Sequence, residues 1–153
     1  MKTRSIALTV VVCFLAALGF AQNPNMGTWK LNEAKSKLVP GVIKNTTVVY
    51  TVAGDSVKVT TEGTGMDGKP MHTEWTGKFD GKDYPLTGDR SADSRSYVKV
   101  DDHTMTLENK KGGVVTTSGK IVVSADGKTR TLTTSGKNAE GKQVTGTAVY
   151  DKQ

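Results

Sequence analysis

From residue 46 onward, apolar side chains recur at every second position in short runs that end at glycine-containing turns. This alternation is typical of strands that bury one face and leave the other in water. Asp-Gly-Lys turns occur at 67–69, 80–82 and 126–128. Asp-Gly favours tight hairpins, because aspartate closes the turn with its side chain and glycine readily adopts a positive φ. The pattern therefore predicts an antiparallel meander of hairpin-linked strands.

The spacing of the turns predicts about ten strands. They are expected near 27–32, 45–53, 56–62, 71–79, 82–87, 94–100, 103–109, 113–124, 129–136 and 142–151. The best helical candidate is Glu33 to Lys37, capped by Asn32 and ended by Pro40-Gly41. Because an open sheet of this size would leave two unpaired edges, we expect an all-β, up-and-down meander that closes into a barrel. A half-open barrel or a twisted sandwich is the alternative.

The start of the chain predicts a secretory signal peptide. Lys2 and Arg4 precede an apolar run over 6–20, and small residues stand where a signal peptidase reads the chain. We expect cleavage after Ala21, which leaves 22–153 as one domain. A membrane anchor needs about twenty apolar residues, so no stable anchor is expected after cleavage.

The cysteine content and the charge distribution indicate the compartment of the protein and the kind of partner it can have. The single cysteine, Cys13, lies in the predicted signal peptide, so the remaining chain has no disulfide, no thiolate metal site and no cysteine nucleophile. A cysteine-free exported domain favours a bacterial periplasmic or secreted protein. Residues 22–153 carry 19 basic and 15 acidic side chains, and the lysines are spread over nearly every turn. This dispersed charge favours solubility and predicts no nucleic-acid partner.

The two ends of the predicted domain resemble the lipocalin and fatty-acid-binding-protein group. Gly27-Thr28-Trp29 opens the domain, and Val149-Tyr150-Asp151-Lys152 closes it. The chain is also similar to small exported bacterial lipocalin-like proteins. The resemblance implies a lipocalin-like barrel that holds a small molecule. Fatty-acid-binding proteins have a two-helix lid where this chain has only residues 33–44. They also anchor the fatty-acid carboxylate with an arginine two residues before the tyrosine of the last strand, and this chain has Ala148 at that position and keeps only Tyr150.

A cavity inside the barrel is the predicted functional site. Five aromatic residues on the apolar phases are the predicted ligand contacts: Tyr50, Trp75, Phe79, Tyr84 and Tyr150. Small residues on the same phases leave space: Gly77, Gly119, Gly146 and Ala148. We therefore expect an exported, non-catalytic binder of a small, partly apolar or amphipathic molecule, without a cofactor.

Two further aromatic residues are predicted to lie away from this cavity. Tyr97 falls on the opposite phase from Val98 and Val100, which are expected to face inward. Trp29 is expected to plug one end of the barrel beneath a basic side chain such as Arg130.

Two other functions remain open from the sequence. One is a surface or interaction protein with a filled core that acts through its turns, especially 83–96. The other is an enzyme with His72 inside the barrel beside a carboxylate, a register that turns Trp75 and Phe79 outward at a cost of about 1.5–3 kcal/mol each. Both His72 and His103 are otherwise expected in solvent. No Gly-x-Ser-x-Gly elbow or Asp-x-Asp-x-Asp-Gly calcium loop is present, so no catalytic or metal site is predicted.

Overall fold

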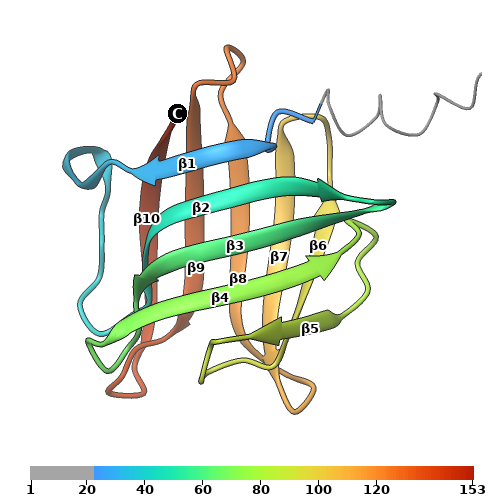
Figure 1. Cartoon of the computed structure of the whole chain (residues 1–153). Coiled ribbons are helices and arrows are strands. Elements are labelled where there is room, and N and C mark those ends of the chain that lie inside the picture. The colour runs from blue at the N-terminus through green and yellow to red at the C-terminus, as the bar shows by residue number, and fades with distance from the viewer. Residues whose placement is uncertain (1–22) are drawn as a thin grey trace, which may run out of the picture.

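The computed structural model describes residues 23–153, and the predicted signal peptide and its cleavage site lie outside them. Ten antiparallel strands form one closed barrel (Figure 1). The strands are β1 (Gly27–Leu31), β2 (Lys44–Ala53), β3 (Ser56–Thr64), β4 (Pro70–Gly77), β5 (Tyr84–Thr87), β6 (Ser94–Lys99), β7 (Thr104–Lys111), β8 (Val114–Val123), β9 (Thr129–Lys137) and β10 (Gln143–Lys152). In Figure 1, strands β1–β5 cross in front of strands β6–β10.

The barrel closes through its first strand. Each strand pairs with the next along the chain, and β1 pairs with β2 on one side and β10 on the other. Lys30 illustrates this double pairing, since it is opposite Thr47 of β2 and Asp151 of β10. This closure confirms the predicted all-β meander and removes the exposed edges of a half-open barrel or sandwich.

The Asp-Gly-Lys turns form as the sequence predicts. Their glycines have φ values of 75°, 79° and 70°. In each turn the aspartate, Asp67, Asp80 or Asp126, accepts a hydrogen bond from the backbone N–H two residues later, at 3.0–3.1 Å. These side chains are therefore used to close hairpins, as is usual for Asp-Gly turns.

The predicted helical segment is a single 3₁₀ turn, Glu33–Lys35. The side chain of Asn32 accepts a hydrogen bond from the Lys35 N–H, so the predicted cap is confirmed, although the helix ends earlier than expected. Within residues 23–153, no helix has the length and apolar character needed to cross a membrane.

Trp29 is fully buried, but a different basic side chain covers it. Lys152 Nζ lies 5.1 Å from the centre of the Trp29 ring, and the indole N–H donates to the Asn25 carbonyl oxygen at 2.8 Å. Arg130 packs instead against Tyr50 and Tyr150. The prediction that Arg130 covers Trp29 is therefore wrong, because β10 extends far enough to bring Lys152 opposite Trp29.

The residues predicted to face inward and outward on β6 are also reversed in the structure. Tyr97 is 1% exposed, whereas Val98 is 43% exposed and Val100 is 59% exposed. Tyr97 faces inward because its ring packs against the aromatic rings of Tyr50 and Trp75. Valine is common on both faces of a sheet, so its alternation alone does not identify the buried face.

Candidate functional site

Aromatic side chains fill the interior near the β2–β3 and β4–β5 hairpins. The Trp75 ring centre lies 4.8 Å from that of Tyr97, 5.8 Å from that of Tyr84 and 6.3 Å from that of Phe79. These edge-on and stacked contacts are within the range that stabilises aromatic pairs. The indole N–H of Trp75 donates to the Arg95 carbonyl oxygen at 2.9 Å. We call Trp75, Phe79, Tyr84 and Tyr97 the aromatic cluster.

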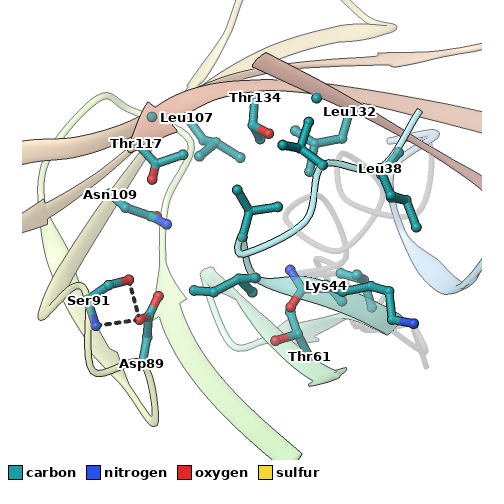
Figure 2. A pocket seen from close by; sticks show the side chains of 18 of the residues that line it. Leu38, Lys44, Thr61, Asp89, Ser91, Leu107, Asn109, Thr117, Leu132 and Thr134 are labelled. Atoms are coloured by element: carbon teal, nitrogen blue, oxygen red, sulfur yellow. Dashed lines mark hydrogen bonds between the residues drawn. The ribbon is translucent and has the colours of Figure 1, made fainter. Parts of the chain in front are cut away.

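The interior toward the other end of the barrel holds a cavity of about 130 Å³ (Figure 2). Figure 2 shows Asn109, Thr117 and Asp89 toward one side of this cavity and Leu132 and Leu38 toward the other. Further lining residues are aliphatic or carry hydroxyl groups: Leu31, Val48, Thr61, Thr73, Leu107, Thr134 and Ala148. The cavity therefore combines apolar walls with groups that form hydrogen bonds.

The segment between η1 (Glu33–Lys35) and β2 forms part of the cavity wall. Its apolar residues in the lining are Leu38, Val39, Val42 and Ile43. Two backbone contacts hold the segment against β10 and the β9–β10 hairpin: Lys37 pairs with Thr147, and the Ala139 N–H donates to the Gly41 carbonyl oxygen at 2.8 Å. We call residues 37–43 the strap.

The cavity volume limits what can enter. A site for one water needs about 10–15 Å³, and an apolar protein cavity of about 150 Å³ holds a benzene molecule. A cavity of about 130 Å³ therefore suits a molecule, or part of one, close to a single aromatic ring in size. Sites for larger, drug-sized ligands are about 300–1,000 Å³.

Two arginine side chains line the cavity, Arg95 from β6 and Arg130 from β9. They are 7% and 2% exposed. Arg95 Nε donates to Asn109 Oδ1 at 2.6 Å, and Arg95 Nη1 donates to the Tyr97 hydroxyl at 3.2 Å. Arg130 Nη2 donates to the Tyr50 hydroxyl at 2.8 Å. The Tyr50 and Tyr97 hydroxyl oxygens are 3.5 Å apart, so the two phenols connect the two guanidinium groups.

Arg130 is incompletely hydrogen-bonded. Its Nε and Nη1 atoms are buried and have no hydrogen-bond partner among residues 23–153. Its guanidinium carbon lies 4.9 Å from the centre of the Tyr50 ring and 5.4 Å from that of Tyr150. Such cation–π contacts contribute about 0.5–2 kcal/mol, whereas an unpaired buried charge costs several kcal/mol. Among residues 23–153, Arg130 therefore has more hydrogen-bond donors than acceptors around it.

The two tyrosines beside Arg130 stay neutral. Burial is the main cause that raises the pKa of both the Tyr50 and the Tyr150 phenol, and the positive charge of Arg130 only partly opposes it. Neither phenol therefore becomes the negative partner of this arginine at neutral pH.

Asp89 is the acidic residue in the cavity wall. Its Oδ1 atom accepts hydrogen bonds from the backbone N–H of Ser91 at 2.7 Å and from the Ser91 hydroxyl at 2.6 Å, as Figure 2 shows. Among the arginines of residues 23–153, only Arg90 forms an ion pair, with Asp67 at 3.1 Å. Asp89 therefore stabilises the turn that contains Ser91 and does not form an ion pair with either buried arginine.

The predicted ligand contacts occupy different parts of the interior. Tyr150 lines the cavity, and its hydroxyl donates to the Asn45 carbonyl oxygen at 3.1 Å. Tyr50 holds Arg130, while Trp75, Phe79 and Tyr84 belong to the aromatic cluster and are not among the lining residues. A ligand-binding role for these five residues stays a prediction.

Sequence reasoning missed the buried polar residues of the site. Arg130 shares the inward phase of Leu132 and Thr134, and Arg95 shares that of Tyr97. A polar residue on the phase of a buried neighbour was the available signal. From the sequence, Arg130 is expected over Trp29 instead, and Tyr97, which shares the phase of Arg95, is expected on the outer face.

His72 lies on the outer face of β4. Its side chain is half exposed, with Nδ1 beside Glu62 Oε1 and Nε2 3.4 Å from Glu74 Oε1. These carboxylates raise the pKa of the imidazole, Glu62 most strongly. The register that would place His72 inside the barrel is therefore wrong. No three His, Cys, Asp or Glu residues within 23–153 are arranged to hold a metal ion.

Comparisons with known proteins add little to this geometry. No family model matches the sequence, and no curated protein matches it. Among solved structures, the chain is similar to a redesigned β-barrel, mFAP1, bound to DFHBI. The two share 14% sequence identity over 86% of this chain and 98% of that one, with a TM-score of 0.46. A likeness this distant says nothing about what the present chain binds.

Proposed function

We propose that this chain is an exported, lipocalin-like protein that binds one small, partly apolar molecule without chemical conversion. The observation that carries the proposal is the unfilled end of a closed barrel, because its 130 Å³ cavity has both apolar and hydrogen-bonding walls. Binding pockets commonly have this composition, with a few polar groups that orient a mainly apolar ligand. Export is proposed from the charged and apolar residues that precede Gln22.

The test is a titration of the purified protein with three compact probes: benzamide, benzyl alcohol and benzoate. Two-dimensional amide NMR spectra are recorded during each titration. We expect at least one probe to cause saturable shifts that concentrate on the strands lining the cavity. If none of the three causes saturable shifts there, the proposal is contradicted and the filled-core interaction protein is favoured.

Neighbouring residues of β9 provide a matched pair of variants. Thr134 lines the cavity, whereas Thr133 is exposed on the outer face. Thr134→Phe places a ring in the cavity and should weaken probe binding by about tenfold or more, while Thr133→Phe should leave it within about threefold. Equal binding by the two variants would show that the probes bind elsewhere. The amide spectrum of each variant confirms that the barrel is folded.

A further inference from the structure

One side of the cavity holds a hydrogen-bond acceptor and a hydrogen-bond donor that the described residues leave unused. Asp89, in the loop between β5 and β6, and Asn109, in β7, both line the cavity, and each is 8% exposed. Figure 2 shows the two side chains on the same side of the cavity. Since other hydrogen bonds fix the orientation of each side chain, the free atom of each is defined.

Ser91 fixes the carboxylate of Asp89. The Ser91 N–H and hydroxyl both donate to Asp89 Oδ1, at 2.7 and 2.6 Å. The other oxygen, Oδ2, accepts no hydrogen bond from residues 23–153, and it is not enclosed by protein, in contrast to Nε and Nη1 of Arg130. A carboxylate oxygen accepts hydrogen bonds and donates none, so a molecule in the cavity must supply a donor to Oδ2.

Arg95 fixes the amide of Asn109. Arg95 Nε donates to Asn109 Oδ1 at 2.6 Å. A guanidinium group has no acceptor, so the amide oxygen must face Arg95 and the amide nitrogen, Nδ2, faces away from it. Nδ2 donates to no acceptor among residues 23–153, and it is likewise not enclosed by protein. Asn109 therefore offers a donor on the side of the cavity where Asp89 offers an acceptor.

The charges around the cavity favour a neutral ligand. The carboxylate of Asp89 repels an anion that approaches this side of the cavity. Two arginines and three lysines also line the cavity and disfavour a cation: Arg95, Arg130, Lys37, Lys44 and Lys137. A neutral molecule that carries a donor and an acceptor on adjacent atoms satisfies Asp89 and Asn109 together and brings no additional charge into the barrel.

We propose that the ligand is a compact, neutral carboxamide. This inference rests on the proposed function, since it names the chemical class that the same cavity takes. The amide N–H of the ligand donates to Asp89 Oδ2, and its carbonyl oxygen accepts from Asn109 Nδ2. The apolar part of the ligand extends toward Leu38 and Leu132, on the other side of the cavity in Figure 2. The cavity volume limits this part to about one ring.

The experiment compares two probes of the same shape. Benzamide carries an amide NH₂ group, and acetophenone replaces this group with a methyl group and keeps the carbonyl oxygen. We expect the purified wild-type protein to bind benzamide about tenfold or more tightly than acetophenone at pH 7, because only benzamide donates to the carboxylate of Asp89. If acetophenone or benzoate binds as tightly as benzamide, the inference is overturned and the proposed cavity stays intact. Failure of benzamide, benzyl alcohol and benzoate together would contradict the proposed function itself.

Isosteric variants locate the two hydrogen bonds. Asp89→Asn keeps Oδ1 for Ser91 and replaces Oδ2 with an amide nitrogen, so the benzamide affinity should fall to about that of acetophenone. Asn109→Asp keeps an acceptor for Arg95 and removes the donor to the ligand carbonyl, so the acetophenone affinity should fall by about threefold or more. Asp93→Asn is the matched control, because Asp93 is exposed and lies outside the cavity lining, and both affinities should stay unchanged. If Asp89→Asn keeps the preference for benzamide, the inference is wrong.

A second measurement does not depend on the folding of Asp89→Asn. In the wild-type protein, the side-chain NH₂ resonances of Asn109 should shift when either benzamide or acetophenone is added, since both probes carry the carbonyl oxygen. Asn109→Asp assigns these resonances by removing them. Asn109 resonances that stay unchanged in saturating benzamide would overturn the inference, whatever the behaviour of Asp89→Asn.

Discussion

The two ends of the barrel interior are built in opposite ways. Toward the β2–β3 and β4–β5 hairpins, the aromatic cluster leaves no space, since a methyl group added at Gly77 would lie 2.5 Å from Tyr84. Toward the opposite end, beneath the strap, the interior keeps a 130 Å³ cavity and two buried arginines. The first region is close-packed and mainly apolar, as in a stable core. The second contains unfilled volume and buried charges without an opposite charge, and both are unfavourable in a core.

The difference indicates a division of roles along one set of strands. A filled aromatic region stabilises the closed barrel through dispersion and burial of apolar surface. A region with unfilled volume and incompletely paired charge lowers stability, so its presence in a folded protein favours a role in binding. Substitutions in each region show whether the two regions differ energetically as their structures indicate.

The largest expected effect is in the aromatic cluster. Trp75→Ala removes a fully buried ring that contacts Phe79, Tyr84 and Tyr97, together with the hydrogen bond to the Arg95 carbonyl oxygen. We expect the free energy of unfolding to fall by about 3–5 kcal/mol, measured by urea denaturation. Leu132→Ala, at the cavity wall, should cost only about 1 kcal/mol, because Leu132 already borders unfilled space. Equal losses would remove the energetic distinction between the two regions.

A pair of glycines tests the same distinction by adding volume. The added methyl of Gly77→Ala meets Tyr84 and Trp75 ring carbons at 2.5–2.7 Å, so the rings must move. We expect a loss of about 1–3 kcal/mol in the free energy of unfolding. In Gly146→Ala, the nearest atom is Val39 Cγ2 of the strap, at 3.3 Å. Because Val39 lines the cavity, its side chain can shift into unfilled space, so the expected change is within about 0.5 kcal/mol. Thermal or urea unfolding of both variants measures the difference.

An intermediate effect is expected where the two regions meet. Tyr50→Phe removes the hydroxyl that accepts the hydrogen bond from Arg130 and lies beside that of Tyr97. Because the acceptor serves a buried charged donor, we expect a loss of about 1.5 kcal/mol in the free energy of unfolding. Urea denaturation measures this loss, and an unchanged free energy of unfolding would show that the Tyr50 hydroxyl does not stabilise the buried guanidinium.

The fold was accessible from the sequence because its signals are local. The Asp-Gly-Lys turns and the alternating runs each specify a hairpin or a strand, and closure follows from the need to pair both edges. The order of ten strands and the cap at Asn32 were predicted in this way. The error at β6 came from a conflict within one strand, where Tyr97 competes with Val98 and Val100 for the interior. That competition is decided by rings on other strands, which no local pattern contains.

The site was less accessible for a related reason. Tyr150 was predicted and does line the cavity, but the sequence pattern extended the same role to aromatic residues that pack against one another. Unfilled space is a property of the whole set of inward side chains, so no single residue indicates it. Arg95 was missed because it shares the phase of Tyr97, which was expected to face outward, and Arg130 was expected to cover Trp29.

The smallest expected effect lies outside both regions, on the same strand as Trp75. Glu62 and Glu74 raise the pKa of His72 above its ordinary value of 6.5. A group whose folded pKa is raised adds stability at pH values below its unfolded pKa, and this contribution disappears as the pH rises through the folded pKa. His72→Gln should therefore be less stable than wild type near about pH 5.5 and equal to it near about pH 9, by urea denaturation at each pH. Benzamide affinity at pH 9 should not change, because His72 lies on the outer face. A changed affinity would mean that the outer wall of β4 communicates with the cavity, and the interior could no longer be treated as two independent regions.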